Sequence, residues 1–151
     1  MTQDVLDISK MTMDMSHPGR GECLGIKTKT ITGLINEIKK GFSFTTVKRY
    51  QTQLGLDLKQ VADAIQVNPR TLDRRKSEGR LHPEESERLL RHARIFELAV
   101  SLFENDTGEA IEWLNTPNLG LGDETPFEFA KTEIGAREVE TLIVQLEHGV
   151  F

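Results

Sequence analysis

The stretch LDLKQVADAIQVNPRTLDRRKSEGRL, residues 56–81, decides how the middle of this chain folds. A first short helix is predicted because its apolar residues repeat at the spacing of one helical face. These residues are Leu58, Val61, Ala62 and Ile65. The residues QVN then make a turn, Asn68 is a good N-cap, and Pro69 suits the first position of a second helix. Leu72 anchors this second helix inward and Gly79 ends it.

The second helix carries a group of cationic side chains in a chain that is acidic as a whole. Two short helices, a tight turn and a basic outer face on the second helix describe a helix-turn-helix, whose second helix enters the major groove of DNA. Arg70 and Arg74 share a face, from which arginine binds guanine O6 and N7. A solvated basic face on a structural helix pair is the alternative. The residues predicted to lie outside and to contact DNA are Asn68, Arg70, Thr71, Arg74, Arg75, Lys76 and Arg80.

Helices are also predicted on the N-terminal side of this motif. One covers residues 31–40, whose apolar side chains share a face, and Gly41 ends it. Another covers FTTVKRYQTQLG, residues 44–55, and ends at Gly55. Residues 1–27 show no sustained period and are interpreted as a loose arm. No stretch alternates apolar and polar residues over the length of a strand, so we expect an all-α protein.

A longer helix is predicted from Pro83 to about Phe103, with apolar residues on two sides. A helix that is apolar on two sides is buried in a core or in a subunit interface. We expect the first stripe to contribute to a homodimer, and burial within one chain is the alternative. The residues of this stripe are Leu89, Ala93, Phe96, Val100 and Phe103.

Three shorter helices are predicted after it. Asp106 caps the first, Thr125 and Pro126 begin the second, and the last follows Gly135 and ends at Gly149. The loop NTPNLGLGDETP separates the first two helices.

Charge is divided unevenly along the chain, whose net charge is −5. Residues 42–82 hold eight basic and four acidic side chains, whereas residues 83–151 hold five basic and fifteen acidic ones. The first part is suited to a polyanion and the second would be repelled by one, which suggests two surfaces with two partners.

Several classes of protein are disfavoured by what the sequence lacks. A single cysteine, Cys23, allows no intramolecular disulfide and favours a reducing cytoplasm. No apolar run approaches the roughly 20 residues of a membrane span, and the first residues do not form a signal peptide. We find no nucleophile–base pair, phosphate loop or His/Cys cluster, so we expect no catalysis, no metal and no cofactor.

The last seventy or so residues resemble the toxin-binding domain of the Xre/MbcA/ParS antitoxin family. The stretch PEESERLLRHAR and the terminal EHGV match in order and spacing, and so do several short groups between them. These groups are Trp113-Leu114, Pro117-Asn118, Leu121-Gly122, Thr125-Pro126 and Thr132-Glu133-x-Gly135. Two positions depart from the family pattern: His82 stands where a small capping residue is usual, and Asp123 where a second glycine is frequent.

The resemblance implies a type II antitoxin, usually dimeric, that silences a co-encoded toxin and represses its own operon. The toxin it implies is one with a RES fold that degrades NAD. Three parts are therefore expected: a loose arm (1–27), a helix-turn-helix module (28–82) and a helical dimerisation and toxin-binding domain (83–151). The expected toxin-binding residues are Trp113, Pro117, Leu121, Gly122, Pro126, Glu147, His148, Gly149, Val150 and Phe151. A stand-alone regulator whose C-terminal domain senses a ligand is the alternative.

Overall fold

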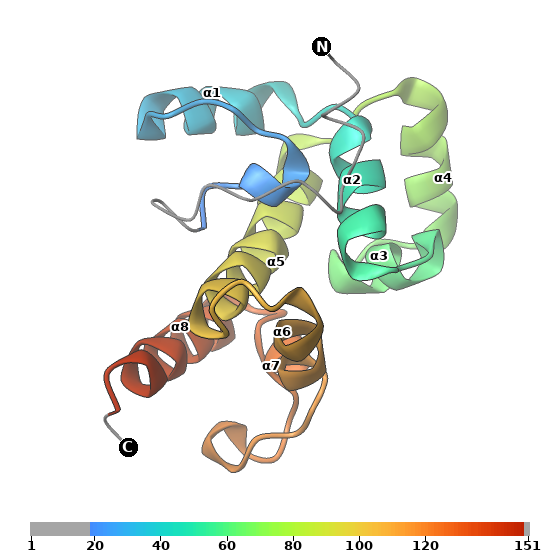
Figure 1. The fold of residues 1–151 in the computed structure, drawn as a ribbon. Coiled ribbons are helices and arrows are strands. Elements are labelled where there is room, and N and C mark those ends of the chain that lie inside the picture. The colour runs from blue at the N-terminus through green and yellow to red at the C-terminus, as the bar shows by residue number, and fades with distance from the viewer. Residues whose placement is uncertain (1–18, 150–151) are drawn as a thin grey trace.

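The computed structural model describes residues 19–149, and every regular element within this range is a helix (Figure 1). The α-helices are α1 (Ile31–Lys40), α2 (Thr45–Leu54), α3 (Leu58–Ala64), α4 (Pro69–Glu78), α5 (Pro83–Leu102), α6 (Thr107–Leu114), α7 (Pro126–Phe129) and α8 (Glu133–Glu147). Two 3-10 turns, η3 (Glu22–Leu24) and η4 (Leu119–Leu121), complete the set. The expected all-α fold is confirmed. Helices α1–α4 and α6–α8 gather toward opposite ends of α5, which runs between them (Figure 1).

The helix-turn-helix of α3 and α4 forms as the sequence predicts. Val61, Ile65 and Leu72 are fully buried between the two helices and α2. The side chain of Asn68 caps α4 by accepting the backbone N–H of Arg70 at 2.8 Å. Gly79 then ends α4 in the left-handed conformation, with φ of 84°, which glycine adopts without steric cost.

Helix α5 is buried on both sides by its own chain. Leu89, Ala93 and Phe96 have no exposed surface, and Val100 is buried as well. Phe103, which caps the end of α5, is half-buried with its ring 6.2 Å from that of Trp113. The prediction that this stripe contacts a second subunit is therefore wrong for Leu89, Ala93, Phe96 and Val100. For Phe103, which is half-buried, it stays a prediction. Helices α1, α6 and α8 pack around α5. The partner of the apolar sides of α5, which the sequence left open, is therefore the same chain.

The prediction of a loose arm over residues 1–27 is wrong for residues 19–27, and residues 1–18 lie outside the described range. Cys23 and Leu24 are buried against α2 and α5. The carboxylate of Glu97, fully buried on α5, accepts the backbone N–H groups of Gly19, Gly21 and Cys23 at 2.8, 3.3 and 2.9 Å. Such charge-assisted bonds offset the cost of burying the carboxylate and tie the segment to the core. Burial, and secondly the charge of Glu97, raise the pKa of the Cys23 thiol well above its usual value.

The C-terminal helices follow the predicted order, with one shift. Helix α8 begins at Glu133, two residues before the glycine that the sequence suggested as its boundary. Gly135 lies inside its first turn, where a Cβ atom would stand 1.7 Å from the carbonyl oxygen of Phe129. This glycine therefore allows α7 and α8 to approach each other closely rather than ending a loop.

Candidate nucleic-acid interface and C-terminal partner surface

The outer face of α4 presents two arginines to solvent. Arg70 and Arg74 are exposed and lie one turn apart, as predicted. Lys76 is also exposed, but two residues beyond Arg74 it lies on a different side of α4. Thr71 is half-buried. Asp73 is exposed between the arginines, and the sequence reading did not consider it. The face therefore offers donors for guanine and for phosphates, together with one carboxylate acceptor.

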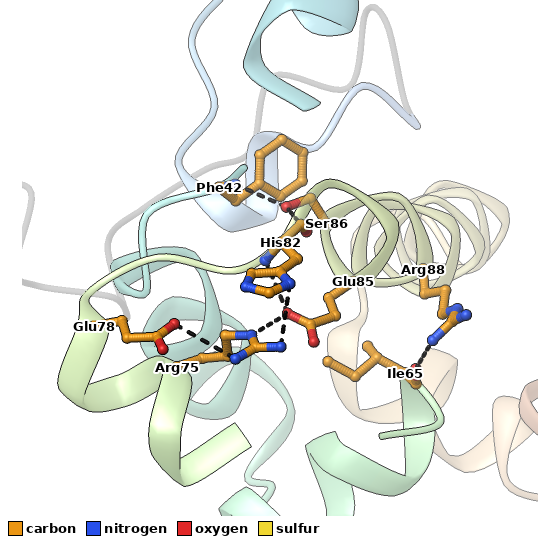
Figure 2. Close-up of polar contacts among 8 residues, drawn as sticks. All are labelled: Phe42, Ile65, Arg75, Glu78, His82, Glu85, Ser86 and Arg88. Atoms are coloured by element: carbon orange, nitrogen blue, oxygen red, sulfur yellow. Dashed lines mark hydrogen bonds and ion pairs between the residues drawn. The ribbon is translucent and has the colours of Figure 1, made fainter. Parts of the chain in front are cut away.

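Arg75 does not belong to this face, which corrects its assignment as a DNA contact. Its side chain is 8% exposed, and its Nε lies 2.8 Å from Oε1 of Glu85, which is equally buried. Glu78 at 3.4 Å and Nδ1 of His82 at 3.2 Å complete its surroundings (Figure 2). Arg75 joins α4 to the start of α5, and a side chain used in this way is not available to DNA.

The Arg75–Glu85 pair is stabilised by more than its own attraction. Burial works to raise the pKa of Glu85, but the bonds from Arg75 and from the backbone N–H of His82 outweigh it and hold that pKa below its usual value. The bond to Glu85 raises the pKa of Arg75 in turn. Because Glu85 accepts the His82 N–H at 2.8 Å, the same carboxylate also caps α5.

Two further predicted DNA contacts have structural roles in the free chain. The side-chain oxygen of Asn68 is used to cap α4. Arg80 is exposed, and its Nη1 donates to the carbonyl oxygen of Gly41, so it joins the end of α4 to the end of α1. Arg70, Arg74 and Lys76 are the predicted cations of α4 that remain directed to solvent.

The helix-turn-helix is bonded directly to the C-terminal domain. Gln66, in the turn between α3 and α4, donates from Nε2 to the carbonyl oxygen of Lys131 at 2.6 Å. The Lys131 ammonium lies 3.1 Å from Asp63 of α3 and 3.0 Å from Glu128 of α7. Because these contacts cross between the two modules, α3 and α7 are held in a fixed relation.

A cavity of about 390 Å³ lies beside this junction, lined by residues of α2, α3, α5, α6 and α7. His92 of α5 forms part of its wall, stacked on Phe127 with ring centroids 4.0 Å apart and hydrogen-bonded through Nδ1 to the Tyr50 hydroxyl. Burial, together with the charges of Lys131 and Arg91, lowers the pKa of His92 to about 3. The imidazole is therefore neutral near pH 7 and acts as a packing group against Phe127.

The predicted toxin-binding residues separate into a buried and an exposed group. Leu121 and Pro126 are buried and Trp113 is half-buried, so Leu121 and Pro126 support the surface from beneath instead of contacting a partner. This corrects their assignment as direct contacts. The exposed members are Pro117, Gly122, Glu147, His148 and Gly149. Val150 and Phe151 lie outside the described residues.

The C-terminal domain also exposes large apolar side chains that the sequence reading did not select. Leu119 is 90% exposed, Ile134 is 78% exposed and Val144 is 50% exposed. Ile134 and Val144 interrupt the polar face of α8, which a helical projection would have revealed. Leu119 lies in a loop, where periodicity gives no signal.

The geometry defines a two-module helical protein: a helix-turn-helix with exposed arginines, and a second helical domain with exposed apolar residues. Residues 33–94 match the family described as antitoxin Xre-like helix-turn-helix domain, and residues 98–149 match the antitoxin Xre/MbcA/ParS C-terminal toxin-binding domain. The chain belongs to the Xre family of type II antitoxins. The two matches meet within α5, later than the boundary at 82/83 that the charges suggested.

Three relatives are similar over most of their length. The antitoxin Xre of Yersinia enterocolitica is 40% identical over 129 residues, which cover 85% of this chain and 87% of the relative. The antitoxin Xre of Photorhabdus laumondii is 32% identical over 121 residues, 80% of each chain. A protein of Sphingobium named Prs ADP-ribosylating antitoxin is 29% identical over 126 residues, 78% of this chain and 79% of the relative.

Proposed function

We propose that this protein binds and inhibits a co-encoded RES-domain toxin that degrades NAD, and that it represses its own operon by binding operator DNA in the cytoplasm. The observation that carries the proposal is the separation of the two surfaces. Helix α4, which carries the exposed arginines, and the end of α8 lie far apart, with α5 between them (Figure 1). One chain can therefore hold DNA and toxin at the same time.

Charge supports the assignment of the two partners. Residues 83–151 hold fifteen acidic and five basic side chains, and a toxin that binds the NAD pyrophosphate needs a cationic cleft. Complementary charge speeds capture of such a toxin and keeps this domain away from DNA. The name of the Sphingobium relative refers to ADP-ribosylation, a reaction that also consumes NAD. The shared chemistry favours a toxin that consumes NAD.

Growth rescue is the first test of this function. Expression of the neighbouring toxin gene alone is expected to stop growth and deplete NAD, and co-expression of this protein is expected to restore both. A toxin that modifies a protein while NAD loss stays small would support ADP-ribosylation in place of NAD degradation. A neighbouring gene whose product is harmless would contradict the antitoxin function.

Arg70→Ala and Arg74→Ala are each expected to weaken operator binding by about 1–3 kcal/mol, because each removes a contact from the exposed face of α4. Inhibition of the toxin should stay unchanged. The matched control is Arg137→Ala, which removes one positive charge from an exposed residue of α8. Operator affinities are measured at several salt concentrations. If both α4 variants bind the operator with wild-type affinity, α4 is not the helix that recognises the operator.

The homodimer is proposed to form through α1, since the stripe on α5 is buried within the chain. Ile31 and Ile35 lie one turn apart on α1 and are 53% and 44% exposed. They are the large exposed apolar residues of the described part of the DNA-binding module. A two-fold dimer would also place two α4 helices on half-sites about one turn of DNA apart.

Ile35→Glu is expected to shift the protein from dimer to monomer at micromolar concentration, because it places a charge in the proposed apolar contact. Light scattering after gel filtration measures the mass. Val144→Glu makes the same change on α8 and should leave the dimer intact. A monomeric wild type, or a dimeric Ile35→Glu variant, would exclude this interface.

The alternative function is a regulator that responds to a small ligand, and the cavity beside His92 is the observation in its favour. This function requires no toxin. Operator binding that depends on a metabolite, without any effect on a neighbouring toxin, would support it.

A further inference from the structure

One leucine of the C-terminal domain is almost fully solvated. Leu119 opens the turn η4, in the loop between α6 and α7, and is 90% exposed. This loop projects from the end of the molecule opposite to α1 (Figure 1). A single exposed leucine is ordinary on a protein surface. Leu119 differs because it lies on a loop whose backbone is held by hydrogen bonds.

The backbone around Leu119 is fixed by a dense set of hydrogen bonds. The carbonyl oxygen of Asn118 accepts the N–H groups of Leu121 and Asp123, each at 3.0 Å, and the Asn118 N–H donates to Glu124 at 3.0 Å. The Asn118 side chain accepts the N–H of Gly120 at 2.8 Å. Beneath the loop, Leu121 is buried in the core. The loop is therefore ordered before any partner binds.

Two glycines stand within three residues after Leu119. Gly120 follows it directly, and Gly122 has no atom within 4 Å of the position a Cβ would take. Asp123 and Glu124 are exposed just beyond. The loop thus presents one exposed apolar side chain, with two exposed carboxylates four and five residues further along the chain.

We propose that Leu119 is an anchor residue for the toxin, which inserts into an apolar socket with a cationic rim on the toxin surface. The inference rests on the proposed function. Residues 98–149 match a toxin-binding domain, and Leu119 is the most exposed large apolar residue of the described chain. An apolar side chain on a preorganised loop loses little entropy on binding and gains the full benefit of burial. The acidic pair matches the charge expected near an NAD-binding cleft.

Leu119→Ala and Leu119→Asp test the anchor. The purified product of the neighbouring toxin gene is titrated against each variant by calorimetry, and the melting temperature and operator affinity are measured in parallel. We expect Leu119→Ala to weaken toxin binding about 10–100-fold and Leu119→Asp to weaken it further. The melting temperature and operator affinity should not change, because Leu119 packs against little of its own chain. Ile134→Ala, which shortens an exposed apolar residue at the start of α8, should bind the toxin as the wild type does.

The possible outcomes separate this inference from the function beneath it. If the wild-type protein does not bind the toxin, both the anchor role of Leu119 and the proposed antitoxin function are excluded. If the wild type binds the toxin and both Leu119 variants bind it with the same affinity, Leu119 is not an anchor, and the proposed antitoxin function is unaffected. A melting temperature lowered enough to account for the loss of binding would show a structural role, and a change of oligomeric state would show a contact between copies of this chain. Either result would overturn the proposal.

Discussion

Glu85→Ala is expected to lower the free energy of unfolding by about 1–3 kcal/mol, because Arg75 loses its closest carboxylate and keeps only the exposed Glu78. Arg75 is 8% exposed and lies 2.8 Å from Glu85. The same substitution removes the acceptor for the His82 N–H at the start of α5. Urea denaturation followed by circular dichroism measures the change.

Glu78→Ala is the matched control for this prediction. Glu78 also contacts Arg75, at 3.4 Å, but its side chain is 47% exposed. Exposed ion pairs contribute about 0–1 kcal/mol, so this variant should remain close to the wild type. Equal losses in the two variants would contradict the assignment of stability to the buried pair (Figure 2).

The contribution of Glu85 also predicts a dependence on pH. Its pKa is lowered in the folded state, so the stability it contributes is present above the unfolded-state pKa of about 4.3 and is lost as the pH falls through the lower folded-state value. The difference in the free energy of unfolding between the wild type and Glu85→Ala should therefore become smaller in acid. A difference that grows as the pH falls below 4 would contradict this sign.

The second large effect is expected at the end of the chain. Removal of His148–Phe151 should abolish or sharply reduce inhibition of the toxin, while folding and operator binding persist. We propose that Val150 and Phe151 enter the NAD cleft, where burial of Phe151 contributes about 1.5–3 kcal/mol. The described part of the tail is exposed, and Ile143 stays buried behind it. NAD loss is measured with full-length and truncated antitoxin.

A parallel melting experiment serves as the control for the truncation. His148 Nδ1 lies 2.9 Å from the carbonyl oxygen of Val144, so the deletion also removes a bond from the last turn of α8. Phe151→Ala keeps that bond and should still reduce inhibition. Unchanged inhibition by the truncated chain would exclude a role for the tail, and so would a loss fully explained by a lower melting temperature.

Local chemistry made the helix-turn-helix predictable from the sequence. Asn68, Pro69 and Gly79 mark the ends of α4 by their own conformational preferences, which act within a few residues. Arg75 was misplaced because its partner, Glu85, belongs to the next helix, and a pairing between helices leaves no trace in periodicity. The order of the N-terminal segment could not be predicted for the same reason, because Glu97 bonds residues more than seventy positions away in the sequence.

The two apolar stripes of α5 show the same limit. Sequence indicates that Leu89 and Phe96 are buried, but it does not say whether the same chain or a second copy buries them. The fold answers this because α1 and α8 cover opposite parts of the helix. Conversely, the exposure of Leu119 depends on the course of a loop, and loops carry no period from which exposure can be predicted.

A titration of the purified neighbouring toxin with this protein, while NAD is followed over time, tests the proposed inhibition directly. NAD consumption should fall to background near a fixed molar ratio, and Arg70→Ala should inhibit as well as the wild type. NAD consumption that continues at the full rate in excess of this protein would contradict the proposed inhibition.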